Sequence, residues 1–549
     1  LSPQNPLFTR IGQMFIEEWE KEFGKNDYYI VDSFNEMEIP FPPKGTKERY
    51  SLLADYGDKV YSSIKAGNPD AIWVMQGWMF GYQRHIWDYE TLQSLVSKVP
   101  NEKMLLLDLA EDYNHLFWKN GANWEFYKGF YGKEWVYSVI PNMGGKSGLT
   151  GDLDFYANGR LEALHSANKG KLTGYGMAPE GIENNEVIYE LVSDGGWTAD
   201  VIDVDKWLYN YSLCRYGSVS DKVTEFWDGM RKSVYGSFTD HPRYNWQFRP
   251  GSIRKGSINA NDAFYQGIET LGNAIPDMKD SPLFAVDMVE MTVQYLGGKM
   301  EILAQAIDLA YQNGDMDKAT AMEAEFEVLI LGADRLLCSH PTLRLENWLA
   351  YASNWGGTLE LKNYYERNAR RIVTVWGPPV DDYSARIWSG LLRDYYLPRW
   401  KQYFAAKRTG KASDITGWEL SWVEKERGLS EAEPYKDVLA GCTELIARAK
   451  SIDNSLLKTM NGEQLGSWTP SDVGNDWQEV VWNMPVSKAA LLEGVRFQHT
   501  RGTAGLEIEE VVLEMDGVEI CKVTQYGSTG LENVNNIYML SIPKDAIGN

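Results

Sequence analysis

The sequence predicts a multidomain protein built from a partial (β/α)8-type barrel, an all-α domain and a C-terminal β-sandwich. Its 549 residues exceed one ordinary domain and, at about 150 residues a domain, indicate roughly three cores. Continuous apolar runs alternate with helical patterns up to about residue 205, and helical periodicity then dominates to about residue 410. Short alternating segments follow from about residue 465, which favours a β domain there.

Residues 1–205 are predicted to form a partial TIM-like barrel. Residues 6–23 place apolar side chains at helical spacing, and Gly24 follows where a C-cap glycine belongs. The expected strands are the apolar runs at residues 28–34, 71–78, 104–109, 135–140 and 172–178. Such runs, separated by helices, are typical of a parallel sheet covered on both faces. Because five strands fall short of the eight in a closed barrel, we expect a fragment that lacks the first barrel strands.

Residues 206–410 are predicted to form an α-helical domain. Its expected helices cover residues 284–313, 318–338, 343–351, 362–375 and 385–408. Residues 411–464 are expected to be a connector, polar as far as residue 433 and helical near residues 438–451.

Residues 465–549 are expected to be a sandwich-like accessory domain that is truncated at its carboxyl end. Its predicted strands are residues 479–482, 492–499, 506–514, 518–524 and 538–542. Asp516-Gly517 is typical of the tight turn in a β-hairpin.

Composition narrows the possible partners. A net charge of −23 without any basic stripe argues against nucleic acid, and no run of 18 apolar residues predicts a membrane span. The four cysteines form no CxxC pair and the six histidines have no ligand spacing, so we expect no metal and no other cofactor. Aromatic rings stack well on sugars, although most of the 21 Trp and 32 Tyr are expected to be packing residues.

Two segments at predicted strand ends could carry chemistry. Asn35-Glu36 follows the first strand, and Glu180 follows the last within a run of small residues. Taken singly, each segment is a weak signal, and a solvated glutamate in a loop or turn explains it better. Together they satisfy the need of glycoside hydrolysis for one carboxyl that donates a proton and one that attacks the anomeric carbon.

The strings DSFNEME, WVMQGWMF, LLLDLAED, PNMGGKSGL, GYGMAPEGIENNEVIYEL, CRYG, TVWGPP and YYLPRW occur in this order between residues 32 and 400. In this the chain resembles the α-N-acetylglucosaminidases of glycoside hydrolase family 89. The resemblance implies a retaining exo-hydrolase of terminal α-linked N-acetylglucosamine, with Glu36 as acid/base, Glu180 as nucleophile and no cofactor. It also implies that an amino-terminal domain is missing, and that the segment after about residue 465 is an accessory module like those of bacterial members.

The resemblance further implies a set of sugar-binding residues: Asn35, Trp78, Asn142, His241, Trp376 and Tyr383. The last two come from the helical domain, which would thereby complete the active site. His241 could instead be a surface-loop residue, and Asn142 could instead hold a loop in place. The acidic pair Asp381 and Asp382 is expected to be a solvated turn beside Trp376.

Two other functions stay open at this point: a glycan-binding homologue or fragment without activity, and a retaining glycosidase for another sugar. The expected partners are glycans ending in α-linked N-acetylglucosamine. The expected location is periplasmic or extracellular, with the export signal in the missing amino-terminal part.

Overall fold

The structure is a computed structural model. It describes residues 1–251, 258–377, 381–411, 413–424, 429–430, 432–454, 466, 476–485, 494–498, 507–528 and 535–540. The chain divides into two compact units. The first contains Leu1–Asp112 and Ala122–Met460, and the second contains Tyr113–Gly121 and Asn461–Asn549.

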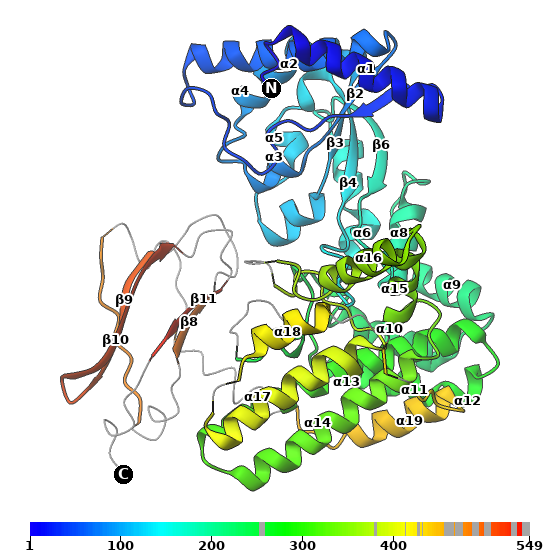
Figure 1. The fold of residues 1–549 in the computed structure, drawn as a ribbon, viewed down its shortest axis with the longest axis vertical. Coiled ribbons are helices and arrows are strands. Elements are labelled where there is room, and N and C mark those ends of the chain that lie inside the picture. The colour runs from blue at the N-terminus through cyan, green and yellow to red at the C-terminus, as the bar shows by residue number, and fades with distance from the viewer. Residues whose placement is uncertain are drawn as a thin grey trace. The chain divides into compact units, whose positions relative to one another are not determined.

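The first unit contains a five-stranded sheet in which all neighbours are parallel (Figure 1). Its order is β1-β2-β3-β4-β6, with bounds β1 Tyr28–Ile30, β2 Ile72–Gln76, β3 Met104–Asp108, β4 Glu134–Val139 and β6 Lys171–Met177. The prediction of five parallel strands is therefore confirmed. The apolar runs overshoot the observed strands by a few residues, because their last residues turn into the loops that carry the candidate site.

Helices cover this sheet: α1 Pro6–Phe23, α2 Lys47–Gly67, α3 Trp78–Tyr82, α4 Tyr89–Val96, α5 Asn123–Phe126, α6 Leu153–Asn158, α7 Arg160–His165 and α8 Glu186–Gly195. The predicted first helix is confirmed at both ends. It begins with Pro6 after Asn5, whose side chain accepts a hydrogen bond from Leu7 N, and it ends at Gly24 with φ 87°. Trp73, Trp135 and Leu106 are fully buried in the core between sheet and helices.

The rest of the first unit is mainly helical, as predicted: α9 Val204–Tyr216, α10 Asp221–Arg231, α11 Asp262–Asn273, α12 Ile275–Met278, α13 Pro282–Gln312, α14 Met316–Leu337, α15 Leu345–Asn354, α16 Leu359–Ile372, α17 Leu397–Thr409, α18 Ile415–Val423 and α19 Val438–Ala449. A short strand, β7 Gly236–Ser237, pairs antiparallel with β5 Gly151–Asp152. Helix α13 is buried along most of its length and packs against α14 and α19 (Figure 1). A helix that is apolar nearly all round belongs in a core.

Two expectations for this region are wrong in part. Residues 385–390 are not helical, and a π-helical turn at Leu392–Tyr396 leads into α17 instead. The expected polar connector contains α18, which begins at Asp414 through a hydrogen bond of 2.8 Å from Gly417 N to its carboxylate. Trp418 and Trp422 of α18 pack on Tyr395, so this segment belongs to the core.

The second unit contains four described strands: β8 Gly494–Gln498, β9 Glu507–Met515, β10 Val518–Ser528 and β11 Asn535–Met539. They form two antiparallel pairs, β9 with β10 and β8 with β11. Asp516 and Gly517 join β9 to β10 with φ 53° and 79°, which confirms the predicted tight turn. The predicted strand at residues 479–482 is wrong, since residues 476–485 contain no strand. The outer parts of the predicted strands 492–499 and 538–542 lie outside the described residues.

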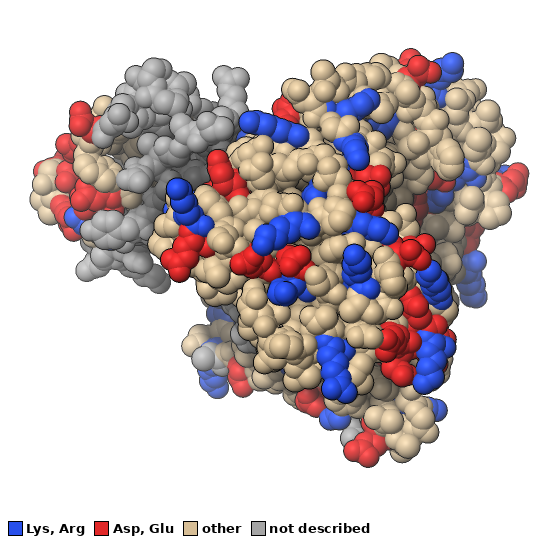
Figure 2. Space-filling view, turned by 90° about the horizontal axis from the view of Figure 1, so that it is seen from above, with Lys and Arg blue, Asp and Glu red and all other residues tan. Residues whose placement is uncertain are grey.

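Side chains of both charges are mixed on the face drawn in Figure 2, where Lys and Arg gather in no continuous stripe. Among the described residues, no helix combines the length and the apolar character needed to cross a membrane.

Candidate active site

Glu36 lies just after β1, in a turn with unusual backbone geometry. Phe34 and Glu36 have φ values of 59° and 51°, which side-chain-bearing residues seldom adopt. The exposed carboxylate of Glu36 accepts a hydrogen bond of 2.7 Å at Oε1 from Trp78 Nε1. Trp78 is the first residue of α3, and its ring stacks on Tyr82 with 5.4 Å between centroids. Asn35, next to Glu36, is also exposed.

Glu180 lies after β6, and the loop that follows β4 supports it. The Gly144 N–H donates a hydrogen bond to Glu180 Oε2, and Glu180 N donates to Asn142 O at 2.9 Å. The Asn142 side chain is buried and donates to Lys146 O at 3.0 Å and to Asn184 Oδ1 at 2.8 Å. Its amide nitrogen is therefore used inside the loop, which favours the loop-holding alternative for Asn142.

Tyr383 connects the two glutamates. Burial, followed by the negative charges of Glu180, Asp240 and Glu36, raises the pKa of the Tyr383 phenol. Both glutamates therefore lie within electrostatic range of the same phenol. On the Glu180 side the approach is close, because a Cβ atom on Gly144, whose N–H donates to Glu180, would lie 3.0 Å from Tyr383 Cε1.

Trp376 and His241 also contact Tyr383. The Trp376 and Tyr383 rings lie 5.2 Å apart, and the His241 ring meets Tyr383 edge-on, also at 5.2 Å. His241 Nδ1 lies 2.7 Å from Asp240 Oδ1, while burial lowers the pKa of the imidazole. His241 therefore lies beside Tyr383. This position does not favour the alternative in which His241 is a surface-loop residue. Trp376 keeps 41% of its surface exposed, so its ring is available to a ligand.

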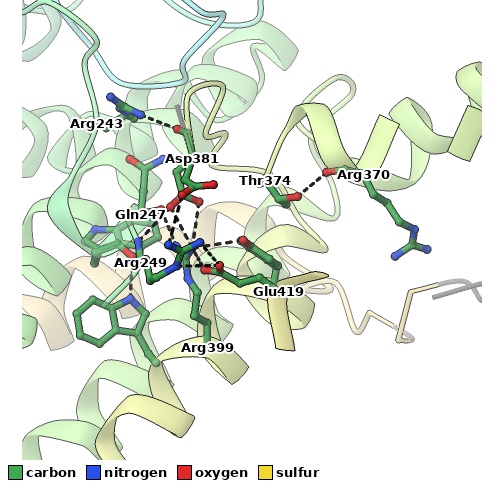
Figure 3. A network of polar contacts seen from close by, with 12 residues as sticks. Arg243, Gln247, Arg249, Arg370, Thr374, Asp381, Arg399 and Glu419 are labelled. Carbon is green, nitrogen blue, oxygen red and sulfur yellow. Dashed lines mark hydrogen bonds and ion pairs between the residues drawn. The ribbon is translucent and has the colours of Figure 1, made fainter. Parts of the chain in front are cut away.

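Asp381 and Asp382 correct an expectation. They do not form a solvated turn, because Asp382 is only 1% exposed and its carboxylate accepts a hydrogen bond of 3.0 Å from Arg399 Nη1. Arg249 Nη1 lies 3.3 Å from Asp381 Oδ2, and Arg249 also pairs with buried Glu419 (Figure 3). This network anchors the segment that carries Tyr383.

Several supporting residues escaped the sequence analysis: Gly144, Lys146, Arg386, Arg399 and Glu419. Lys146 is buried with its Nζ 4.3 Å from the centre of the Tyr383 ring, and burial lowers the pKa of its amine. Two signals were present in the sequence. A Gly-Gly pair follows the fourth strand, and single arginines stand among apolar residues in SARIW and LPRW. In the described part of the chain, no group of three or more His, Cys, Asp or Glu residues could hold a metal ion.

Two family models match the chain. The α-N-acetylglucosaminidase (NAGLU) TIM-barrel domain matches residues 1–199, and the α-N-acetylglucosaminidase (NAGLU) C-terminal domain matches residues 207–448. The human protein called α-N-acetylglucosaminidase is 30% identical over 416 residues, which are 74% of this chain and 54% of the human one.

Solved structures of a family 89 glycoside hydrolase from Clostridium perfringens share the fold. Its complex with PUGNAc has a TM-score of 0.70 at 24% identity, covering 83% of this chain and 52% of that chain. Its complex with 2-acetamido-1,2-dideoxynojirmycin has a TM-score of 0.69 at 25% identity, covering 82% and 52%. A variant with two glutamates changed to glutamine, in complex with its substrate GlcNAc-alpha-1,4-galactose, has a TM-score of 0.70 at 24% identity, covering 83% and 52%. The chain spans about half the length of these relatives.

Proposed function

This chain belongs to the α-N-acetylglucosaminidase family of glycoside hydrolases, family 89, and on that premise we propose that it is a retaining exo-glycosidase. Its substrate would be a glycan that ends in α-linked N-acetylglucosamine. The observation that carries the proposal is that two carboxylates, Glu36 and Glu180, both lie within electrostatic range of Tyr383. Two carboxyl groups on opposite sides of one sugar are what double displacement requires.

Glu180 acts as the nucleophile in this proposal. One carboxylate oxygen attacks the anomeric carbon, while Glu36 donates its proton to the departing glycosidic oxygen. Glu36 then takes a proton from water, which attacks the same carbon and releases the sugar with its original configuration. The Gly144 N–H supports this role, because its hydrogen bond fixes the orientation of the Glu180 carboxylate.

The α-configuration of the substrate favours a protein nucleophile. In a β-linked N-acetylglucosaminide, the 2-acetamido oxygen can attack from the face opposite the leaving group. In the α-anomer that oxygen lies on the wrong face, so a carboxylate of the enzyme must make the displacement. Trp78 and Trp376 would bind the sugar ring through their aromatic faces, and Asn35 and His241 would supply polar contacts.

An aryl α-N-acetylglucosaminide tests the proposal in the full-length protein. We expect Glu180→Ala to lower kcat by about 10⁴-fold or more, since the covalent step loses its nucleophile. We expect Glu36→Ala to lower kcat by about 10²- to 10⁴-fold, the usual contribution of general acid catalysis. Glu38→Ala is the matched control, because Glu38 is an exposed carboxylate two residues from Glu36.

Wild-type turnover by Glu36→Ala or Glu180→Ala would reject the assignment of roles. Cleavage of a different aryl glycoside instead would show a glycosidase for another sugar. Glycan binding without any turnover would show a binding protein. GlcNAc-α-1,4-galactose is the natural disaccharide to try first, since it is the substrate held by one of the similar structures.

A further inference from the structure

We propose that Arg386 is a positioning residue for the nucleophile, because it fixes the Gly144-Gly145 turn whose peptide N–H holds the Glu180 carboxylate. The inference rests on the proposed function, since Arg386 acts only through Glu180. It goes further by assigning the orientation of the nucleophile to a residue of the helical region.

The glycine turn has no spare room between Glu180 and Arg386. Gly144 and Gly145 have φ values of 68° and 59°, which glycine adopts without the strain that other residues would suffer. A Cβ atom on Gly145 would lie 2.1 Å from Arg386 Nη2 and 2.9 Å from Glu180 O. A Cβ atom on Gly144 would lie 2.1 Å from Lys146 Nζ and 3.0 Å from Tyr383 Cε1. The turn therefore fits its place only as glycine, with the Gly144 N–H directed at Glu180 Oε2.

Arg386 holds this turn through the main-chain carbonyl of Gly144. Its Nη1 donates to Gly144 O at 2.8 Å and to Ser384 Oγ at 2.8 Å. Ser384 Oγ in turn donates to Gly144 O at 2.7 Å. The carbonyl of Gly144 is thus held twice, by a charged group and by a hydroxyl. Hydrogen bonds from a charged donor are roughly twice as strong as neutral ones, so the guanidinium is the stronger restraint.

Arg386 is buried, so its contact with Gly144 is not the incidental contact of a surface side chain. The side chain is 6% exposed, and burial lowers the pKa of its guanidinium, whereas the nearby charges of Glu183 and Glu180 raise it. Keeping a cation in the interior is costly unless the groups around it compensate. Here the compensation comes from the charge of Glu183, then from that of Glu180, and from the hydrogen bonds to Gly144 O and Ser384 Oγ.

The same loop is held at a second point by the helical region. Ile387 N donates to Ser147 Oγ at 3.0 Å, and Gln294 Nε2 of α13 donates to Ser147 O at 2.6 Å. The loop after β4 is therefore fastened along residues 144–147 by side chains and main chain from residues 294–387. Among these residues, Arg386 binds Gly144, the residue whose N–H donates to the Glu180 carboxylate.

The test uses Arg386→Met and Arg386→Lys in the full-length protein, with an aryl α-N-acetylglucosaminide as substrate. We expect Arg386→Met to lower kcat by about 10²-fold with little change in KM, because a small displacement of a reacting group can cost that much. Arg386→Lys keeps the charge and should recover part of the loss. Arg160→Met is the matched control. Arg160 is also a buried arginine bound to main-chain carbonyls, those of Gly195 and Thr198, and it should keep wild-type kcat.

A second arm separates positioning from general damage. In Glu180→Ala, azide can replace the missing carboxylate and yield the β-glycosyl azide, with the C–N bond formed as the aryl C–O bond breaks. We expect Arg386→Met to leave this azide reaction unchanged, because no nucleophile remains to be positioned. Equal slowing of the azide reaction, or wild-type kcat in Arg386→Met, would overturn the inference.

The outcomes also separate this inference from the proposed function. Full turnover by Glu180→Ala overturns both. Loss of turnover in Glu180→Ala together with wild-type kcat in Arg386→Met overturns only the role of Arg386. If Arg386→Met does not fold, as judged by thermal unfolding, the comparison of Arg386→Lys with wild type decides. A wild-type kcat in Arg386→Lys together with an unchanged KM would then reject the inference.

Discussion

Arg399 shows how one buried side chain supports the candidate site from a distance. It is fully buried, and its Nη1 donates to Asp382 Oδ1 at 3.0 Å and to Glu419 Oε1 at 2.9 Å (Figure 3). Its Nη2 donates to Gln247 O at 2.6 Å. Asp382 precedes Tyr383, so the cation fixes the backbone that carries the Tyr383 side chain.

Replacing Arg399 should therefore be costly for stability. Arg399→Met leaves the Asp382 and Glu419 carboxylates buried without their common cation, and we expect a loss of about 3–5 kcal/mol in the free energy of unfolding. Denaturant unfolding followed by tryptophan fluorescence measures it. The control is Arg448→Met, since Arg448 is paired with Glu325 at the surface and should cost less than about 1 kcal/mol. Equal losses in the two variants would contradict the argument.

At the scale of elements, helix α13 carries acidic groups into the interior. Asp287 is paired with Arg215 of α9 at 2.6 Å and accepts from the Tyr216 hydroxyl at 2.8 Å. Glu290 is 2% exposed, and its Oε1 accepts no hydrogen bond from the described residues. The two carboxylates line a small cavity, which is also lined by Glu186, Val187, Tyr211, Tyr216, Phe226, Trp227, Tyr235 and Met291.

Burial first, and then the charges of Glu186 and Asp287, raise the pKa of Glu290, against an opposing effect of Arg215. The unfolded chain releases this proton near pH 4.3, while the folded protein keeps it to higher pH. Below pH 4.3 both states hold the proton and the group costs nothing. As the pH rises from there toward the raised folded pKa, the unfolded state gains relative to the folded one and stability falls.

Glu290→Gln should remove this pH dependence, because the amide keeps the shape of the side chain without its titration. We expect the melting temperature of Glu290→Gln to rise relative to that of wild type as the pH is raised from 4 to 8, at roughly 2–4 °C for each kcal/mol. Scanning calorimetry across this range measures the difference. Glu360→Gln, at an exposed position in the first turn of α16, is the control. A constant offset between Glu290→Gln and wild type at every pH would contradict the assignment.

At the scale of the whole molecule, the candidate site contains residues from both regions of the chain that family models match. Glu36, Trp78 and Glu180 come from residues 1–199, whereas Trp376 and Tyr383 come from residues 207–448. Arg243 Nη1 donates to Asp382 O at 2.5 Å, which ties the loop that carries His241 to the segment that carries Tyr383. Substitutions in the helical half should therefore change sugar binding directly.

Trp376→Ala tests whether a residue of the helical region contributes to sugar binding at the site. Loss of aromatic surface against a sugar should weaken the transition-state complex by about 1.5–3 kcal/mol, which lowers kcat/KM roughly tenfold to a hundredfold. Steady-state kinetics on an aryl α-N-acetylglucosaminide measures the change. Trp355→Ala is the control, because Trp355 is 84% exposed and lies at the end of α15. An unchanged kcat/KM in Trp376→Ala would place the sugar elsewhere.

Patterns that are local in the chain predicted their structures well. Continuous apolar runs predicted five parallel strands. The reason holds best for the central strands β2, β3 and β4, which are largely buried, since a strand covered on both faces needs apolar residues at every position. The predicted hairpin turn at Asp516-Gly517 was also local. Alternation over only four residues failed at residues 479–482, because so short a pattern does not specify a pairing partner. The adjacent aspartates Asp381 and Asp382 were misjudged for a related reason. Their cations are Arg249 and Arg399, which lie outside any local pattern around the two aspartates.

The amino-acid sequence by itself determined the class of fold, the family and the two candidate carboxylates, since each depends on residue type and spacing along the chain. Only the tertiary structure decided what surrounds those carboxylates. The hydrogen bond from Ser384 to Gly144 joins residues separated by 240 positions, and nothing in either segment specifies the other. Buried polar groups need hydrogen-bond partners, and those partners come from distant segments that only the complete fold brings together.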